Sequence, residues 1–480
     1  MRRNPPRLPA ILAACLLGAS AVPVATAAND AQRPNVLFIA IDDLRNHLGA
    51  FGVEWAKTPN LDAFAQTSRA FTHHYVTVPT CGAARYGLLS GRRPTHRAHL
   101  NNGGVMHNAE EWVHRSLPGI FQAGGYRTYA LGKISHHPGG LTGGDWDRPP
   151  EEMPGVWDRH WIPDGPWEHA RSIMHGYANG VPRRPGRSPA IEAHDGPDES
   201  YPDAWVAKDA VAKLEILADS DEPWFFGVGF FKPHLPFAAP KRDFDTHEGN
   251  VPDLEPEIAA RRDWPSGWHN SGEFRRNYGH PGGRDPETHP EYARELREAY
   301  TATVTYMDRQ LGRVFEALEE TGLADDTIVV VWSDHGFLLG EHAIWGKHCL
   351  YEHSLRCPLM IRYPGMTAPG EMSDAIVKTI DILPTLADLA GLPVPDEVHG
   401  SSLRPQLDDP AAPSGRPALG YWGGQRTIRD TRWRLIVHRD GDQVELFDYD
   451  TDPYEIHNHA EAHPAVVEEL RELLESTHGF

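Results

Sequence analysis

The hydrophobic pattern of this chain contains four nearly unbroken apolar runs, at residues 35–41 (NVLFIAI), 126–132 (YRTYALG), 223–231 (PWFFGVGFF) and 327–333 (TIVVVWS). None of them alternates apolar and polar positions as a half-exposed strand would. Continuous apolar runs of this length are typical of parallel strands buried on both faces. We therefore expect these four segments to be the centre of a parallel sheet.

Helical periodicity fills the intervals between the runs. The clearest case spans residues 291–321, where apolar side chains recur at steps of three and four and Gly322 follows as a cap. A shorter helix is expected at 381–392. Strands that alternate with helices predict an α/β fold, with a large mixed, mostly parallel sheet flanked by helices.

The pattern changes near residue 413. Short strand signals bounded by turns (PALGYW, RWRLIVHR, QVELFDYD) are followed by a helical stretch at 465–477. A chain of 480 residues has room for one large α/β domain and a smaller one. We therefore predict a main domain at 29–412 and a small C-terminal α+β domain at 413–480.

Titratable residues follow each of the four apolar runs. They are Asp42 and Asp43 after the first, Lys133 and His136 after the second, Lys232 and His234 after the third, and Asp334 and His335 after the fourth. Parallel strands place their carboxyl ends at one edge of the sheet, where ligands bind in folds of this kind. Taken singly, such an Asp can be a turn former or helix cap and such a His or Lys can be solvated. Their coincidence at four strand ends favours a functional site.

The residue types at these ends suit a metal and an anion together. Carboxylates such as Asp42, Asp43 and Asp334 are hard ligands for Ca²⁺ or Mg²⁺, and His335 adds a nitrogen. The positive side comprises Lys133, Lys232, Lys347 and Arg85. A dication that faces cationic side chains can neutralise a tetrahedral oxyanion ester.

One cysteine stands at the start of a predicted helix, in the stretch VPTCGAARYGLLSGRRP at residues 78–94. The helix would begin near Cys81 and end at Gly91. Backbone N–H groups at a helix start attract anions and lower the pKa of a thiol, and Arg85 lies one turn further on. The alternative interpretation of Cys81 is a buried structural cysteine.

The first 28 residues predict export. Three arginines precede an apolar stretch at about 8–24, and ATAA at 25–28 resembles a cleavage site. Lipidation at Cys15 in LAAC is a less favoured alternative, because the apolar run continues beyond it. We expect a periplasmic or secreted protein with no transmembrane segment. Of the remaining cysteines, Cys349 and Cys357 are close enough in sequence to pair across a short loop, which the sequence leaves open.

The net charge of 46 − 67 = −21 argues against a nucleic-acid partner. An anionic substrate would then need a locally basic site. One basic island, RRPGR at 183–187, either meets a second anionic group or forms a solvated turn. Two irregular segments, 137–203 and 244–290, are expected to be walls or lids of the site. The tryptophans Trp146, Trp157, Trp161 and Trp167 either stack on sugar rings or pack these loops.

The motif CGAAR, followed by LLSGRRP, resembles the Cys-x-Pro/Ala-x-Arg signature of the type I sulfatases. NVLFIAIDD and TIVVVWSDHGFLLGEHAIWGK resemble the two metal motifs of that family, and GKISH, KPHLPF and ELFDYDTDPYEIHN resemble further segments. The resemblance covers almost the whole mature chain and implies an alkaline-phosphatase-like fold. His335 in place of the commoner Asn, the spacing of Lys133 and His136, and KPHLPF before PKRDF are similar to the iduronate 2-sulfatase branch.

The resemblance implies a role for each of the residues above. Asp42, Asp43, Asp334, His335 and a modified Cys81 would bind one Ca²⁺, with Mg²⁺ or Mn²⁺ as options. In the family this cysteine is oxidised to formylglycine (3-oxoalanine), whose hydrated form attacks sulfur. Arg85 and Lys133 would hold that group, and His136 would act on it as a base. His234 and Lys347 would contact the sulfate, and Lys232 would flank them.

These implications predict a sulfuric ester hydrolase that acts on a sulfated carbohydrate. The branch indicates a 2-O-sulfated uronic acid in a glycosaminoglycan or another sulfated polysaccharide. A formylglycine-generating or sulfatase-maturing enzyme would be a partner, and Ala83, at a position where Pro is commoner, bears on how completely it converts Cys81. The alternatives are a phosphonate or phosphate ester hydrolase of the same superfamily and a non-catalytic glycan-binding protein with unmodified Cys81.

Overall fold

A computed structural model of the chain describes Met1 and residues 33–142, 150–439 and 441–477. The predicted signal segment at 1–28, Cys15 within it, and Trp146 lie outside the described residues. In the described part of the chain, none of the helices is both long and apolar enough to cross a bilayer.

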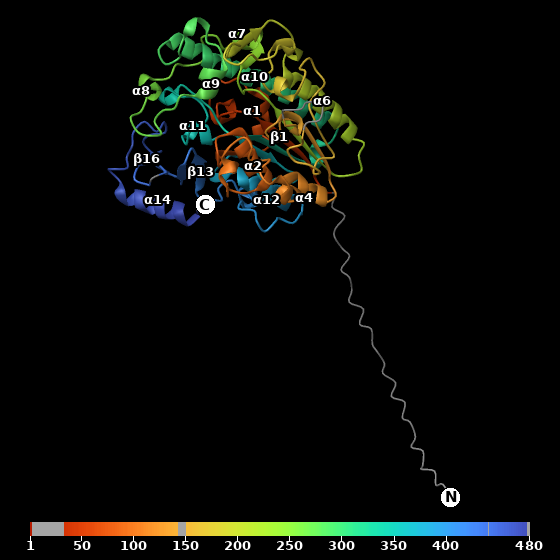
Figure 1. Cartoon of the computed structure of the whole chain (residues 1–480). Helices are drawn as coiled ribbons and strands as arrows, with labels where there is room; N and C mark the ends of the chain where they lie inside the picture. The colour runs from red at the N-terminus through yellow and green to blue at the C-terminus, as the bar shows by residue number, and fades with distance from the viewer. Residues whose placement is uncertain (2–32, 143–149, 440, 478–480) are drawn as a thin grey trace. The chain divides into compact units, whose positions relative to one another are not determined.

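The core of the structure is an eight-stranded sheet with the order β12-β2-β11-β8-β1-β6-β3-β4 (Figure 1). The pairs β8–β1, β1–β6, β6–β3, β3–β4 and β2–β12 are parallel, and β11 is antiparallel to both of its neighbours. The strands are β1 (Asn35–Ile41), β2 (Arg69–Tyr75), β3 (Arg127–Gly132), β4 (Arg159–Trp161), β6 (Trp224–Phe230), β8 (Thr327–Ser333), β11 (Leu359–Arg362) and β12 (Ser373–Lys378). The mixed, mostly parallel sheet is confirmed, with the four predicted strands at its centre.

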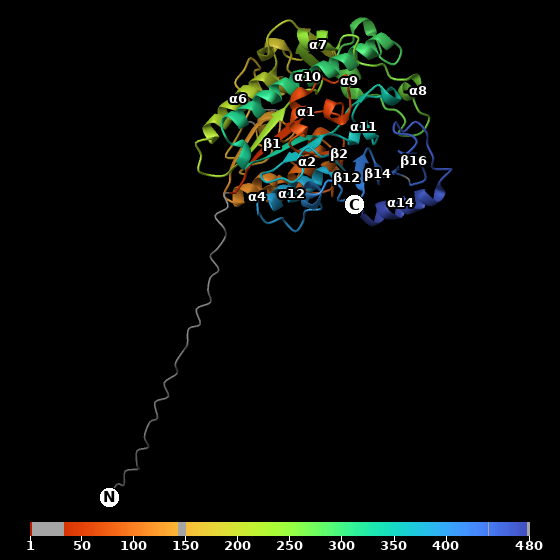
Figure 2. The same cartoon turned by 180° about the vertical axis from the view of Figure 1, so that it is seen from behind.

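Helices cover both faces of this sheet (Figures 1 and 2). Strand β1 shows why, because all seven of its residues are buried. Leu37, Ile39 and Ile41 pack in one apolar cluster with α1 (Pro59–Ala65), α6 (Pro202–Leu217) and α10 (Pro290–Glu320). Val36 and Phe38 point the other way, into a cluster with α2 (Cys81–Ser90), α4 (Leu117–Ala123) and α12 (Ile382–Leu389). Period-2 alternation thus buries both faces of an apolar strand.

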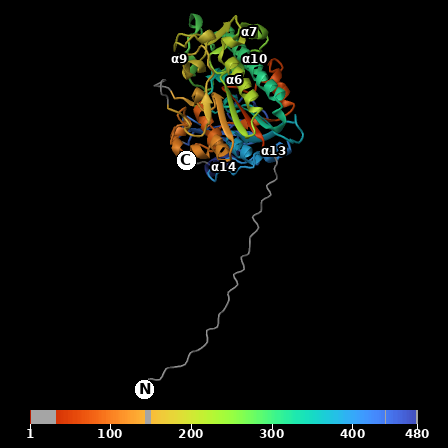
Figure 3. The same cartoon turned by 90° about the vertical axis from the view of Figure 1, so that its right-hand side faces the viewer.

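The predicted helices at 291–321 and 381–392 correspond to α10 and α12. Helix α2 begins at Cys81 and ends at Ser90, and Gly91 follows as its C-terminal cap with a left-handed φ of 65°. The side view shows α6 and α10 on one side of the central strands and α13 (Arg404–Asp408) on the other (Figure 3).

The two segments expected to be irregular carry only short elements. Strands β5 (Ile191–His194) and β7 (Phe237–Pro240) pair in parallel, and β9 (Leu338–Leu339) and β10 (Trp345–Gly346) form a small hairpin. Helices α5 (Ala170–Met174), α8 (Pro256–Ala259) and α9 (Gly272–Asn277) lie within these segments. Other short helices of the main domain are α3 (Ala109–Trp112), α7 (Lys241–His247) and α11 (Glu352–Leu355).

The C-terminal part forms an antiparallel sheet of β13 (Ala418–Trp422), β14 (Gln425–Arg429), β15 (Trp433–Val437) and β16 (Val444–Asp448). Helix α14 (Pro464–Thr477) follows, and its Leu470 and Leu474 pack with Ile428 and Leu435 of the sheet. The sheet and helix confirm the small α+β character. The predicted boundary at 412/413 stays a prediction.

Candidate active site

The titratable residues meet because the four central strands end in register. Ile41 at the end of β1 pairs with Ser333 of β8 and with Phe230 of β6, and Gly132 of β3 pairs with Gly229 of β6. The residues that follow these strands therefore leave the sheet at one edge. At Gly229 a Cβ atom would lie 2.2 Å from the carbonyl oxygen of Lys133, so only glycine lets the two strand ends approach this closely.

The turn after β1 holds Asp42 and Asp43 in a constrained geometry. Asp43 has a φ of 64°, a left-handed conformation that is uncommon outside glycine. Tyr300 of α10 fixes the turn, since its hydroxyl donates to the Asp43 carbonyl at 2.8 Å and accepts the Arg45 N–H at 3.0 Å. The Asp43 N–H donates to Asp334 at 3.1 Å. The long helix thus positions the carboxylates.

Two buried cations, Lys133 and Arg85, pair with the carboxylates of Asp42 and Asp334. Lys133 Nζ donates to Asp42 Oδ2 at 2.5 Å, and Arg85 Nε donates to Asp334 Oδ2 at 3.0 Å. Burial raises the pKa of Asp42, but the charges of Lys133, His234 and Arg85 outweigh burial and hold that pKa well below its usual range. Arg85 also bonds the carbonyls of Lys133 and Ile134. In this structure the guanidinium of Arg85 therefore binds the Asp334 carboxylate.

Cys81 occupies the first position of α2 and faces His335 and Lys347. Its Sγ lies 3.3 Å from His335 Nε2 and 3.4 Å from Lys347 Nζ. Burial and the charge of Asp42 raise the pKa of this thiol well above its usual value, although Lys133 and Lys347 oppose the rise. The expectation that the helix start lowers the thiol pKa was wrong, because desolvation of a fully buried thiolate outweighs the helix field. An unmodified Cys81 is a neutral thiol.

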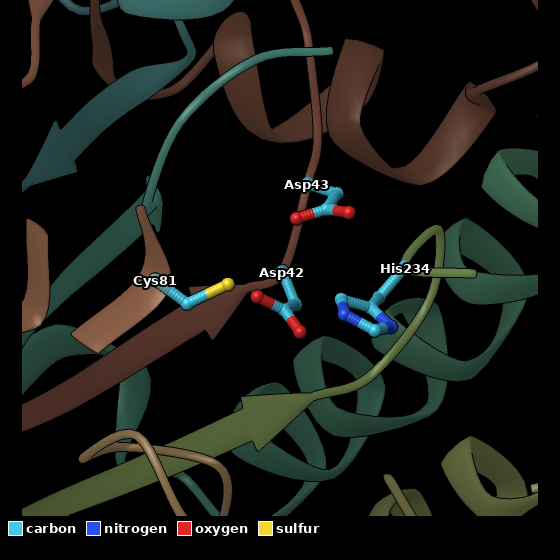
Figure 4. Close-up of side chains that lie close together, drawn as sticks. All are labelled: Asp42, Asp43, Cys81 and His234. Carbon is cyan, nitrogen blue, oxygen red and sulfur yellow. The ribbon is translucent and has the colours of Figure 1, made fainter. Parts of the chain in front are cut away.

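The same residues offer a site for a hard divalent cation. Ligand atoms of Asp42, Cys81, Asp334 and His335 all lie within 4.8 Å of one another, and so do those of Asp42, Asp43, Cys81 and His234. Figure 4 shows the second of these groups, which converges from three separate segments of the chain. Asp42 Oδ1 is buried without a hydrogen-bond partner among the described residues, as a ligand oxygen for a cation would be. The donor set fits Ca²⁺, Mg²⁺ or Mn²⁺.

A pocket of about 460 Å³ opens above this cluster. Four of the predicted residues line it, namely Cys81, His136, His234 and Lys347. The predicted metal ligands other than Cys81, together with Arg85 and Lys133, are fully buried and are not among its described lining residues. The structure thus separates a pocket-facing layer from a supporting layer beneath it.

The basic residues that face the pocket differ in how they are held. Lys347 Nζ donates to Asp43 Oδ1 at 2.9 Å. His234 Nδ1 lies 2.7 Å from the Leu235 carbonyl, which leaves Nε2 toward the pocket. Burial first, and then the charge of Lys133, lower the pKa of His136 well below its usual value, so its ring is neutral near pH 7. Its Nδ1 atom has no hydrogen-bond partner in the described part of the chain.

Lys232 supports the loop that carries His234. Its Nζ donates to the carbonyls of His234 at 3.2 Å and Pro236 at 2.6 Å. Burial lowers the pKa of this lysine to about 8. The flanking position predicted for Lys232 therefore corresponds to a residue that orders the loop beneath the pocket.

Sequence reasoning missed several residues of the pocket, among them Glu273, Asn102, His175 and His348. Glu273 of α9 contacts both His234 Nε2, at 3.1 Å, and Lys347 Nζ, at 3.2 Å. Asn102 accepts the N–H of Gly82 at 3.1 Å, next to the nucleophile candidate. His175 and His348 also line the pocket, and the His348 ring stacks on Trp422 of β13 at 4.7 Å. The only available signal was that Glu273 and His175 fall in the two irregular segments expected to form walls.

Three of the tryptophans that were candidates for stacking on sugar rings pack against the protein instead. The rings of Trp157 and Trp161 lie against Phe225 and Phe226 of β6, and Trp167 is buried with its Nε1 donating to the Tyr177 carbonyl. None of the three is among the described residues that line the pocket, so the sugar-stacking interpretation is wrong for them. Cys349 and Cys357 are free thiols, so they form no disulfide.

Comparisons with known proteins agree with this geometry. A family model described as Sulfatase matches residues 34–392, and one described as N-sulphoglucosamine sulphohydrolase, C-terminal, matches residues 340–478. An iduronate 2-sulfatase from Mus musculus is 30% identical over 401 residues, which span 75% of this chain and 69% of that protein. A choline-sulfatase from Rhizobium meliloti is 29% identical and spans 89% of this chain and 83% of its own length.

Solved structures share the fold across nearly the whole chain. The phosphonate monoester hydrolase of Agrobacterium radiobacter superposes with a TM-score of 0.75 at 25% identity, covering 93% of this chain and 95% of that one. A 2-O GAG sulfatase superposes with a TM-score of 0.69 at 23% identity, covering 93% and 92% of the two chains. At that identity the second likeness shows the fold alone.

Proposed function

Because this chain belongs to the sulfatase family and is a sulfuric ester hydrolase, we propose that it removes sulfate from a 2-O-sulfated uronic acid of a glycosaminoglycan or similar polysaccharide. The observation that carries the proposal is the position of Cys81, which opens α2 at the floor of a basic pocket, between His335 and Lys347. The names of the mammalian relatives, iduronate 2-sulfatases at 29–30% identity, support the uronic acid. We further propose that the chain is exported and matured by a formylglycine-generating enzyme.

The proposed chemistry assigns a task to each layer of the site. A hard divalent ion held by Asp42, Asp43, Asp334 and His335 would draw charge from the sulfate oxygens, and a formylglycine at position 81 would supply the attacking oxygen. His234 and Lys347 would bind the remaining sulfate oxygens and steady the leaving oxygen. Lys133 and Arg85 hold the carboxylates in place from behind.

The proposed substrate is tested with defined sulfated disaccharides. We expect release of inorganic sulfate from a disaccharide with a 2-O-sulfated uronic acid, and slower release from isomers sulfated at other positions. Release from a 6-O-sulfated glucosamine in preference to the uronic acid would contradict the proposed sugar and leave the sulfatase class intact.

A phosphonate ester hydrolase is a second candidate, because the structural likeness to the phosphonate monoester hydrolase covers nearly all of both chains. Rates on 4-nitrophenyl sulfate and on a 4-nitrophenyl phosphonate ester discriminate the two functions. We expect the sulfate ester to be the better substrate by kcat/KM. The reverse order would favour the phosphonate activity.

The acid side of the pH–rate profile is expected to depend on His136. A base must be neutral to accept a proton, and the pKa of His136 lies well below 6.5 because of burial and Lys133. Lowering the pH to 6.5 therefore leaves the base form in place, and the decline in kcat/KM begins only below that pH. His136→Gln should lower kcat by roughly 10²- to 10³-fold. A decline centred above pH 6.5 that persists in the variant would contradict the assignment.

Glu273 is expected to compete with the substrate for its cations. Its carboxylate occupies His234 and Lys347, the two residues that would bind sulfate. In Glu273→Gln both His234 and Lys347 lose an anionic partner, so the inhibition constant of inorganic sulfate should fall by about 3- to 10-fold. Glu287→Gln is the matched control, because Glu287 is exposed in the same segment and pairs with Arg261. An unchanged or weaker inhibition by sulfate would show that Glu273 only positions its neighbours.

A further inference from the structure

Three arginines that line the pocket form no ion pair with a carboxylate of the described residues. They are Arg171 of α5, Arg183 in the basic island and Arg276 of α9. Many arginines of this chain form ion pairs, and the neighbouring Arg275 pairs with Asp285. For Arg171, Arg183 and Arg276 the described residues provide no such pair. Cations left unpaired at a concave surface are available to a ligand.

The basic island is folded so that one of its arginines faces the pocket. The Arg184 N–H donates to Ser188 Oγ at 2.9 Å, and Gly186 and Ser188 bond to the backbone of Asn277 and Gly279 at 3.1 and 2.8 Å. This turn leaves Arg184 and Arg187 exposed. Arg183 alone among the island's residues lines the pocket. The solvated turn is thus confirmed for Arg184 and Arg187, and Arg183 stays the candidate for contact with a second anionic group.

A short series of contacts connects Arg183 to the sulfate-binding end of the pocket. The Arg183 guanidinium lies 5.6 Å from the centre of the buried Tyr278 ring. The Tyr278 hydroxyl is 3.3 Å from His175 Nδ1, and the His175 ring is 5.4 Å from the ring of His234. Arg183 thus lies on a wall of the same pocket and is linked to His234 through Tyr278 and His175.

The charge of the pocket is opposite to that of the protein. The chain carries a net charge of −21, yet the pocket contains Lys347 and three arginines. Glu273 is the single carboxylate among the described lining residues, and His234 and Lys347 engage it. A sulfate ester with a single negative charge would bind at His234 and Lys347 and would leave the three arginines without a ligand. The excess of positive charge therefore matches a ligand with a second anion.

We propose that Arg183, together with Arg171 and Arg276, forms a second anion subsite. It binds a carboxylate or a second sulfate of the saccharide whose sulfate ester lies at Cys81, His234 and Lys347. The inference rests on the proposed function and adds to it the residues that select a substrate with two anions. Arginine suits this task, because its planar fork binds either group through two parallel hydrogen bonds.

The test compares substrates that differ in one anion. The substrates are a disaccharide with a 2-O-sulfated uronic acid, the same compound with its carboxylate reduced to an alcohol, and a form with a second sulfate. In Arg183→Met the preference for the carboxylate over the alcohol, measured as a ratio of kcat/KM values, should fall by about 10- to 100-fold. Arg184→Met removes the same charge from the exposed neighbour and should leave the ratio unchanged.

The outcomes show which anion the subsite binds, a carboxylate or a second sulfate. If the preference for the second sulfate falls instead, the subsite binds sulfate. If Arg183→Met changes neither ratio, or lowers kcat/KM equally for all three substrates, the subsite is overturned. Thermal melting of both variants shows whether the fold is retained.

Failure of the proposed function can be distinguished from failure of the subsite. If the wild-type protein releases sulfate from none of these disaccharides, the proposed substrate is wrong. The subsite is then tested through inhibition of 4-nitrophenyl sulfate hydrolysis by the unsulfated uronate disaccharide and its reduced form. Stronger inhibition by the carboxylate, lost in Arg183→Met, supports the subsite. Equal inhibition by the two compounds overturns it.

Discussion

Replacing Cys81 with alanine is expected to lower kcat for sulfate ester hydrolysis by on the order of 10³-fold or more. The side chain lies at the start of α2, 3.3 Å from His335 and 3.4 Å from Lys347, and is the only thiol or hydroxyl among the described residues that line the pocket. Serine should not restore the rate while its hydroxyl stays unoxidised, because only an aldehyde at this position can form the hydrate that attacks sulfur. Steady-state kinetics of the wild type, Cys81→Ala and Cys81→Ser measure the effect.

The chemical state of Cys81 is the accompanying measurement. Burial raises the pKa of its thiol, so an unmodified Cys81 would be protonated and a poor nucleophile. We expect the peptide that contains it to be about 18 Da lighter than the thiol form, from conversion to an aldehyde. Cys349→Ala, at another buried free thiol, is the matched control and should keep its activity.

Full activity with an unmodified Cys81 would refute the formylglycine mechanism. The glycan-binding alternative makes a different prediction, namely that Cys81→Ser binds a sulfated saccharide as the wild type does and that modified protein releases no sulfate. Sulfate release from modified protein would exclude that alternative.

The central strands could be predicted because the property that determines them, a continuous apolar run, is visible within each segment of the sequence. The segments that became β1 and β8 are apolar at nearly every position, and only burial on both faces accommodates such runs. Parallel pairing then brings Asp42 and Asp334 to the same edge without any further information. The metal-ligand candidates and Lys133 follow from that single step.

The rest depends on contacts between distant segments. Strand β11 runs antiparallel between β2 and β8, a choice that its four residues do not encode. Glu273 approaches His234 only because a wall segment folds over the strand ends. The pKa of Cys81 shows the same limit, since the helix start is visible in the sequence while the burial that outweighs it is not.

Replacing Asp42 with asparagine is expected to remove the response of the protein to a divalent cation and to lower kcat by roughly 10²- to 10⁴-fold. Asp42 belongs to both candidate ligand groups, and its Oδ1 has no hydrogen-bond partner in the described part of the chain. In the wild type, Ca²⁺ added after treatment with a chelator should raise Tm, because an ion that binds only the folded state stabilises it. In Asp42→Asn this rise should be absent.

A control variant at a second buried carboxylate, Asp308, distinguishes the effect of losing a metal ligand from the effect of losing a buried charge. Asp308 accepts the backbone N–H groups of Asn60 and Leu61 far from the pocket, so Asp308→Asn should lower Tm and still respond to Ca²⁺. If chelation left both Tm and activity of the wild type unchanged, the cluster would hold no exchangeable ion. Lys133 and Arg85 alone would then have to balance Asp42 and Asp334. In that case Asp42→Asn would leave Lys133 without its carboxylate partner and destabilise the fold through an uncompensated buried cation, and added metal would not reverse the loss.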